Sequence, residues 1–294
     1  MKQRPLTDRV VLVTGAARGI GAATARHAAT RGARLALVGL EPDHLAAVAA
    51  DLPGPAGRHA WFTCDVTDQS TVDAAVAGTV ETLGRIDAVV ANAGVANLGT
   101  VAVAPVDALV RTIEVNLLGV LRTVKATLPF VTERHGHYLL VSSAAAFLAL
   151  PGMAAYAASK AGVEHFGNVL RIETAHLGVT VGTAHMTFVD TDLVRDLQDD
   201  LPSARRGLAR ALVPVDDCAR AFVTGLERRS RRVYLPRAVA VAQLLRGLAH
   251  TAPGDWPLRR RARRSVPVTE REVRALGRSF GAHSVAQSTV DSDG

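Results

Sequence analysis

Short apolar runs alternate with helix-like stretches along the first four fifths of the chain. The runs consist mainly of Val, Leu and Ala without a polar face, which is typical of strands buried on both sides in a parallel sheet. A long helix is expected over about residues 106–128. The alternation predicts an α/β fold with helices on both faces of the sheet. The strands are expected at residues 9–14, 34–40, 60–64, 86–91, 138–142, 179–185 and 232–235.

The pattern changes after the last expected strand. Residues 236–250 form an apolar helical stretch too short to span a bilayer, and a dense arginine cluster follows at 259–264. We therefore expect one domain over residues 1–236. Residues 237–294 are expected to be a helical and basic C-terminal extension, disordered after about residue 281.

Composition narrows the class of protein. Of the 294 residues 48% are hydrophobic and only 4% aromatic, so a large core must be built from Ala, Val and Leu. Two cysteines, Cys64 and Cys218, provide neither a disulfide framework nor a metal cluster, which fits a reducing cytoplasm. No apolar run reaches spanning length and the N-terminus lacks the pattern of a signal peptide, so neither a membrane span nor a secretory leader is expected.

The net charge of +7 is unevenly distributed, because the arginines crowd after about residue 205. An apolar helix beside an arginine cluster can make a peripheral contact with an anionic membrane. Alternatively, it docks on the body or on a partner subunit, ahead of a solvated basic tail. Nucleic acid is not an expected partner, because the sequence has no reader motif and no aromatic residues among the basic ones.

The first expected strand breaks at once into a glycine turn. Gly15, Gly19 and Gly21 let the backbone turn sharply and approach a pyrophosphate, and the helix from Ile20 adds N–H groups at its positive end. Strand, glycine turn and helix form the layout of a dinucleotide site, although a purely structural turn is the alternative. No Gly-Lys-Ser/Thr follows, which argues against a P-loop nucleotidase.

Residues 143–160 carry candidate acid–base chemistry. Tyr156 and Lys160 lie one turn apart if this segment is helical, and an ammonium beside a phenol lowers the pKa of the phenol toward neutral pH. Ser143, at the end of the fifth strand, could hold a substrate oxygen, whereas Ser142 points to the opposite face. On its own, the Tyr-x-x-x-Lys spacing also fits a helix with a half-buried aromatic and a solvated lysine.

Small and polar residues follow several strands at the point where each strand ends. Gly15, Asp65, Asn92, Ser143 and the loop after His185 should share the carboxyl edge of one parallel sheet. Ligands bind at that edge in open α/β folds. The convergence predicts a dinucleotide enzyme.

Together these motifs resemble the short-chain dehydrogenase/reductase family over about residues 9–235. The resemblance implies a doubly wound, Rossmann-type sheet of seven parallel strands with a nicotinamide dinucleotide across its carboxyl edge. It also implies a substrate lid over about residues 192–214 and a homodimer or homotetramer built on the long helices. The matching residues are Thr14-Gly15-x-x-x-Gly19-x-Gly21, Asp65, Asn92-Ala93-Gly94, Asn116, Ser143 and Tyr156-x-x-x-Lys160.

The family's roles carry over to the matching positions. Tyr156 would be the general acid or base, Lys160 would lower its pKa and hold the nicotinamide ribose, and Ser143 would bind the substrate carbonyl. Asn116 would support a proton-relay water, and no metal is implied. The residues implied to bind the cofactor are Gly15, Arg18, Gly19, Ile20, Gly21, Glu41, Asp65, Val66, Asn92, Ala93, Gly94, Tyr156, Lys160 and Thr191.

Two departures from the family pattern affect the cofactor. A Met-Thr pair stands at 186–187 where the family usually has Pro-Gly, which weakens the assignment of Thr191 to the nicotinamide carboxamide. Positions 39–40 lack both the acid of NAD-preferring members and the base of NADP-preferring ones. Arg18 could pair with a 2′-phosphate, while Glu41 could repel it or bind the ribose hydroxyls. NADP is therefore expected by a narrow margin over NAD.

The expected function is hydride transfer between NAD(P) and a carbonyl or secondary alcohol, with Tyr156 handling the proton. Leucines of the lid, with Phe147, Leu148 and Leu150, suggest an apolar substrate, although the same side chains would also pack the lid on the body. The alternative is a non-catalytic dinucleotide-binding regulatory or scaffold protein. An isomerase or dehydratase on the same fold also stays open.

Overall fold

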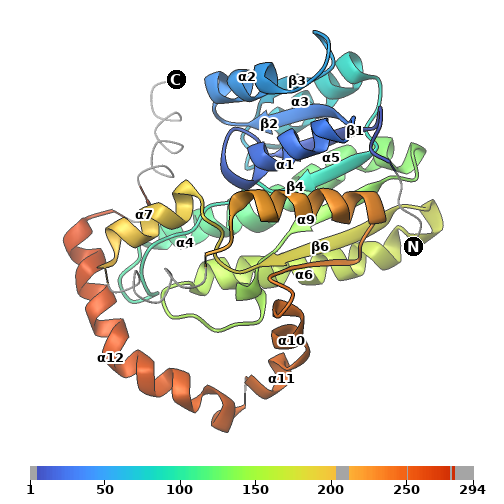
Figure 1. Cartoon of the computed structure of the whole chain (residues 1–294). Helices are drawn as coiled ribbons and strands as arrows, with labels where there is room; N and C mark the ends of the chain where they lie inside the picture. The colour runs from blue at the N-terminus through green and yellow to red at the C-terminus, as the bar shows by residue number, and fades with distance from the viewer. Residues whose placement is uncertain (1–4, 203–211, 250, 279, 282–294) are drawn as a thin grey trace.

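The seven strands of the described chain form one parallel sheet in the order β3-β2-β1-β4-β5-β6-β7 (Figure 1). The computed structural model describes residues 5–202, 212–249, 251–278 and 280–281. The order reverses between β1 and β4, as in a doubly wound Rossmann-type sheet, so the predicted fold is confirmed. The strands are β1 Val10–Thr14, β2 Arg34–Gly39, β3 Ala60–Thr63, β4 Ala88–Ala91, β5 His137–Val141, β6 Thr180–Met186 and β7 Arg232–Leu235.

Alternate residues of each strand supply two separate cores, because successive side chains point to opposite faces. Val11 and Val13 of β1 belong to one core, and Val10 and Leu12 belong to the other. The first face is covered by α1 (Gly19–Thr30), α2 (Pro42–Asp51) and α9 (Val215–Arg228), and the second by α3 (Gln69–Leu83), α5 (Gly119–Glu133) and α6 (Ala154–Glu173).

The region expected as one helix over residues 106–128 consists of three elements. α4 (Val106–Ile113) passes into a π-helical turn, Glu114–Leu118, and α5 then continues to Glu133 although it contains Pro129. Such a turn widens the helix by one residue and is frequent at functional sites. Here it contains Asn116.

The C-terminal arm, which we define as the described residues of 236–281, leaves the body after β7 and curves back to it (Figure 1). The predicted helical and basic extension is confirmed, and its basic stretch, for which a solvated tail was one alternative, is the helix α12. This helix begins at a cap, where Thr251 Oγ1 accepts from the N–H of Gly254 at 3.3 Å, and ends at Gly277 with φ of +67°. The arm contains α10 (Val239–Leu244), α11 (Arg246–Ala249) and α12 (Ala252–Leu276).

The far end of the arm packs on the expected substrate lid. Val273 of α12 forms a buried apolar cluster with Leu98 and Leu201, just beyond α7 (Asp192–Asp200). Residues 203–211 of the expected lid, and residues 282–294 for which disorder was expected, lie outside the described residues. Among the helices that the structure describes, none is long and apolar enough to cross a membrane.

Candidate active site

In the glycine turn after β1, the main chain packs closely against itself and against the main chain of Ala93. Gly15 and Gly19 have φ of +63° and +56°, a region that side chains disfavour, and a Cβ on Gly21 would lie 2.0 Å from the carbonyl oxygen of Gly15. α1 begins at Gly19 with no side-chain cap and no acidic residue in its first turn, so its N–H groups are available to an anion. Ile20 packs partly on the core below. The turn fits a pyrophosphate.

The segment after β4 holds this turn in place. Nδ2 of Asn92 donates to the carbonyl oxygens of Thr14 and Gly15, at 3.0 and 3.2 Å. The N–H groups of Asn92 and Ala93 both donate to Oγ1 of Thr14, at 3.0 and 3.1 Å. Asn92 therefore supports the main chain that a dinucleotide would approach.

Asn116 is fully buried and joins three parts of the site. Its Oδ1 accepts from the N–H of Val95 at 2.8 Å, and its Nδ2 donates to the carbonyl of Val95 at 2.9 Å and to Oγ of Ser159 at 3.2 Å. A Cβ on Gly94 would lie 3.1 Å from Oδ1 of Asn116 and 3.5 Å from Nζ of Lys160. The amide thus holds the loop after β4 against α6, and Gly94 leaves the space beside Lys160 open.

Ser143, Tyr156 and Lys160 meet beyond the carboxyl end of β5. The hydroxyl of Ser143 lies beside that of Tyr156 and favours its ionised form. Nζ of Lys160 lies 5.7 Å from the centroid of the Tyr156 ring. Oγ of Ser143 also accepts from the N–H of Ala145 at 3.1 Å and lies 3.4 Å from the carbonyl oxygen of Met186. This arrangement can present two hydroxyl groups to one substrate oxygen.

Burial has the largest effect on the pKa values of both Tyr156 and Lys160. Burial raises the pKa of Tyr156, although the neighbouring Ser143 hydroxyl acts in the opposite direction. It lowers the pKa of Lys160 to about 8, and Nζ of Lys160 donates to the carbonyl of Val141 at 3.0 Å. The shift of Tyr156 is opposite to the one that the Tyr-x-x-x-Lys spacing predicts. The ammonium of Lys160 lies over the ring of Tyr156 and donates to a main-chain carbonyl, so the effect of burial on the pKa of the phenol is the larger one.

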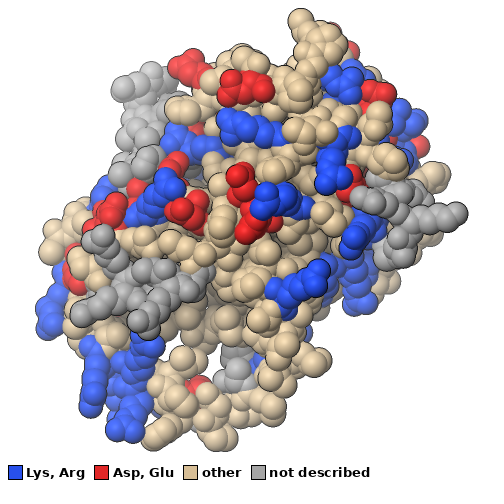
Figure 2. Space-filling view, viewed as in Figure 1, with Lys and Arg blue, Asp and Glu red and all other residues tan. Residues whose placement is uncertain are grey.

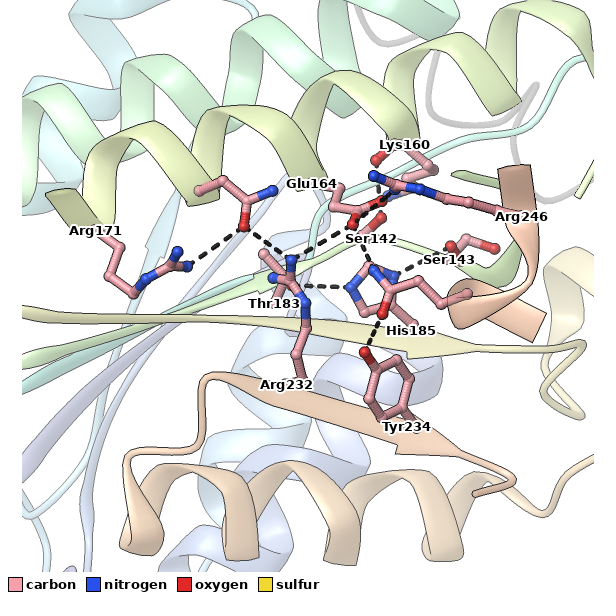
Figure 3. Close-up of polar contacts among 12 residues, drawn as sticks. Ser142, Ser143, Lys160, Glu164, Arg171, Thr183, His185, Arg232, Tyr234 and Arg246 are labelled. Carbon is pink, nitrogen blue, oxygen red and sulfur yellow. Dashed lines mark hydrogen bonds and ion pairs between the residues drawn. The ribbon is translucent and has the colours of Figure 1, made fainter. Parts of the chain in front are cut away.

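Ser142 differs from Ser143 in what it contacts. Its Oγ donates to the main-chain carbonyl of Lys160 at 2.8 Å (Figure 3). Ser142 therefore ties β5 to α6, and Ser143 is the hydroxyl that lies beside Tyr156.

Arg18 and Glu41 form an ion pair beside the glycine turn. Nε of Arg18 donates to Oε2 of Glu41 at 3.0 Å, and Nη2 bonds Oε1 of the same carboxylate. Nη2 also lies 3.5 Å from Nε2 of His44. The sequence suggested opposite effects of the two residues on a 2′-phosphate. Because they are paired, Arg18 offsets the repulsion that Glu41 would exert alone.

Asp65, one of the residues implied to bind the cofactor, follows β3 and already has three donors. Its Oδ1 accepts from the N–H and Oγ1 of Thr67, each at 2.8 Å, and its Oδ2 accepts from Nη2 of Arg111 at 3.1 Å. Burial opposes its charged form, but these hydrogen bonds hold the pKa of Asp65 below its usual range. Val66 is buried and lies against Gly119. No motif pointed to Arg111, which reaches Asp65 from α4 across 46 residues of sequence.

Thr191 lies at the start of α7, next to the glycine turn. Its methyl carbon would be 3.5 Å from a Cβ on Gly19. After β6 ends at Met186, the chain reaches α7 through a bridge between Val189 and Val213. A pocket of about 390 Å³ opens beside this contact. Its lining residues are Gly19, Ala23, Arg26, His27, Thr30, Asp190, Thr191, Asp192, Arg195, Val215 and Asp216.

Three polar residues near Ser143, two of them buried and the third half-buried, were not expected from the sequence. They are Glu164 on α6, His185 on β6 and Arg232 on β7 (Figure 3). Two signals were available, since Glu164 follows Lys160 by one helical turn and His185 interrupts an apolar strand. Within the described residues, no group of three or more His, Cys, Asp or Glu side chains could hold a metal ion.

Comparisons with known proteins point to one family. A family model described as short chain dehydrogenase matches residues 9–202. A D-threitol dehydrogenase of Mycolicibacterium smegmatis is 41% identical over 189 residues, which cover 64% of this chain and 73% of that protein. Oxidoreductase UcpA of Salmonella typhimurium is 35% identical over 214 residues, or 70% of this chain and 81% of that one. An uncharacterized oxidoreductase of Mycobacterium tuberculosis is 31% identical over 235 residues, or 79% and 89%.

Proposed function

We propose, from the premise that this chain belongs to the short-chain dehydrogenase family and is an NAD(P)-dependent oxidoreductase, that it interconverts a carbonyl compound and a secondary alcohol. When bound, the nicotinamide supplies or accepts the hydride. The residues fit such a group, since Gly15, Gly19 and Gly21 leave the turn at the uncapped N-terminus of α1 without side chains. The glycine turn would hold the pyrophosphate, and Asn92 would brace that turn.

The observation that carries the proposal is the meeting of Ser143, Tyr156 and Lys160 at the carboxyl end of β5, an edge of the parallel sheet where ligands bind. In reduction, Tyr156 gives its hydroxyl proton to the substrate oxygen, and in oxidation it takes the proton back. Ser143 donates a hydrogen bond to the same oxygen. The positive charge of Lys160 favours the tyrosinate that remains after proton transfer.

Replacing Tyr156 with Phe tests this assignment. The ring stays and the acid is lost, so we expect kcat to fall by about 10³-fold while the Kd of the dinucleotide changes by less than about threefold. Turnover is followed by absorbance of the reduced nicotinamide, and binding by its fluorescence. The matched control is Tyr138→Phe, which removes a buried hydroxyl bonded to Thr127 at 2.9 Å, away from the site. Near-normal turnover in Tyr156→Phe would refute the proposal.

NADP is proposed as the preferred cofactor because of Arg18. The guanidinium lies at the N-terminus of α1 and would have to exchange Glu41 for a 2′-phosphate. Arg18→Ala should raise the KM for NADP by about tenfold and leave the KM for NAD nearly unchanged. Glu41→Gln should lower the KM for NADP, because it frees Arg18. A wild-type enzyme that prefers NAD tenfold would overturn this assignment.

The substrate is proposed to be a small-molecule apolar carbonyl compound or alcohol. Fewer apolar side chains support this proposal than the sequence suggested. Phe147 is 2% exposed and packs with Ala144 and Val239 of the arm, and Leu201 packs with the arm at its other end. These two side chains serve packing, so the apolar character rests on the half-buried Leu150 and Leu193. A non-catalytic scaffold would not need Ser143, Tyr156 and Lys160 together.

Self-association through the long helices is proposed from apolar side chains on α4 and α6. Val106 is 70% exposed, Val110 52% and Ile172 73%. Exposed apolar side chains on neighbouring elements mark an interface when they form one surface. A homodimer or homotetramer is expected, and the mass from light scattering measures it.

A peripheral contact with an anionic membrane is proposed for the tip of the arm, facing the cytoplasm. Leu244, Leu248 and Trp256 are 84%, 67% and 59% exposed, and arginines of α12 follow directly. Figure 2 shows Lys and Arg side chains gathered over the lower part of the arm in that view. Apolar side chains beside a basic row suit a negatively charged lipid surface.

A further inference from the structure

The arm is attached to the body at two places that border the active site. Its near end, at α10 and α11, lies against α6 and the loop after Ser143. Its far end lies against the expected lid, where Arg278 pairs with Asp200, and against the segment between β4 and α4, where Thr100 Oγ1 donates to Oε1 of Glu270 at 2.7 Å. The near attachment contains charged side chains, although apolar side chains alone would be enough to pack the arm on the body.

Glu164 is the centre of the near attachment. Its side chain is 5% exposed, and it lies on α6 one turn beyond Lys160. Gln243 Nε2 donates to Oε1 at 2.5 Å, Arg232 Nη2 lies at 3.4 Å, and Arg246 Nη1 lies 3.3 and 3.4 Å from the two carboxylate oxygens (Figure 3). We call these four residues the Glu164 cluster. A buried carboxylate loses several kcal/mol of hydration, so it requires such donors.

A chain of hydrogen bonds runs from the Glu164 cluster to Ser143. Arg232 Nη1 donates to Thr183 Oγ1 at 2.6 Å, and Thr183 Oγ1 lies 2.8 Å from Nε2 of His185. Because burial lowers the pKa of His185 to about 4, its ring is neutral and carries one proton. Thr183 receives the bond from Arg232 and gives its own proton to Nε2. The proton on Nδ1 of His185 then points to the carbonyl oxygen of Ser143, 3.4 Å away.

Aromatic packing supports the same link. The His185 ring lies between Phe147, with centroids 5.7 Å apart, and Tyr234, with centroids 5.5 Å apart. The hydroxyl of Tyr234 bonds the side-chain oxygen of Gln243 in the arm. The loop after Ser143 and the helix with Tyr156 are therefore held by one network.

We propose that Glu164 and Arg232 are positioning residues and that the arm, through Gln243 and Arg246, helps to hold the active-site groups in position. The cluster holds α6, which carries Tyr156 and Lys160, in register with the strand end that carries Ser143. This inference rests on the proposed function, because it assigns the network to the alignment of the two hydroxyls. A displacement near 1 Å between reacting groups costs about 10²-fold in rate.

The test compares Glu164→Gln and Arg246→Gln, singly and together, in the full chain. Each single change should lower kcat by about 10- to 100-fold with the dinucleotide Kd held within about twofold. The double variant should lose little more than the worse single one, since both changes break one network. Arg246→Lys should recover part of the loss. The control, Arg220→Gln, breaks the exposed pair with Asp217 on α9 and should leave kcat unchanged.

A second readout separates positioning from stability and from the proposed function. Hydrogen exchange should quicken in residues 143–148 and 154–164 in both single variants, and not in Arg220→Gln, whether or not a substrate is known. A lower Tm with normal kcat and unchanged exchange in these segments would overturn the inference. If the wild-type enzyme and the Tyr156→Phe variant turn over equally fast, the proposed function is wrong. The hydrogen-exchange data would still decide the role of the Glu164 cluster.

Discussion

Lys160 is 3% exposed, and burial alone lowers its pKa to about 8. Within the described part of the chain its Nζ donates to the main-chain carbonyl of Val141 and has no carboxylate partner. A charge in this environment opposes folding, because an ammonium is better solvated in water. The proposed function explains its presence, since a cation next to Tyr156 is useful only when that hydroxyl releases its proton.

This conflict predicts a pH-dependent gain in stability for Lys160→Met in the dinucleotide-free protein. The pKa falls from 10.5 in the unfolded chain to about 8 in the folded one, which corresponds to ~3 kcal/mol. Between these values the unfolded chain binds more protons, so the wild type gains stability as pH rises from 8 to 10.5. The variant should therefore be about 2–3 kcal/mol more stable at pH 7, and its advantage should shrink by pH 10.

Denaturant unfolding at the two pH values measures this difference. Lys125→Met is the control, because Lys125 is exposed on α5 and should show no pH-dependent advantage. An advantage for Lys160→Met that is equal at pH 7 and pH 10 would contradict the argument. We also expect the variant to lose most of its turnover.

Elements whose signals are local could be predicted from the sequence. The apolar runs predicted the parallel strands, and the glycine turn predicted the start of α1, because both depend on residues close in the chain. The π-helical turn at Asn116 was not predicted, since its amide is held by Val95 and Ser159, distant in sequence. The same reason applies to Glu164 and Arg246, which are 82 residues apart.

A helical and basic extension was predicted, but the length of α12 was not, for a different reason. Pro257 and Pro267 each remove a hydrogen-bond donor from the helix interior, and the arginines between them suggested a solvated chain. The cap at Thr251 and the left-handed Gly277 determine the ends of α12, and Val273 fastens its last turns to the body. These packing contacts, made by residues distant in sequence, stabilise the last turns of α12 and could not be predicted from local propensity.

At the scale of the whole molecule, the arm reaches outward between its two attachments and exposes an apolar tip (Figure 1). Trp256 at the tip lies under the guanidinium of Arg260, 5.6 Å from its ring centroid. Exposed arginines occupy positions 259, 260, 261, 263 and 264, so a second copy placed symmetrically on this surface would meet like charge. An anionic lipid surface satisfies both the apolar and the charged side chains.

The protein should therefore sediment with vesicles that contain phosphatidylglycerol, much less with pure phosphatidylcholine, and lose the binding at high salt. Replacing Arg259, Arg260 and Arg261 with Gln removes about 1 kcal/mol per arginine, so binding should weaken roughly 100-fold. Trp256→Ser should weaken it as well, whereas Trp61→Ser, on the exposed face of β3, should not. Equal binding to both kinds of vesicle would leave only the apolar tip as an explanation. No binding to either, with Trp256 emission that changes on dilution, would instead identify the tip as an interface between copies of the chain.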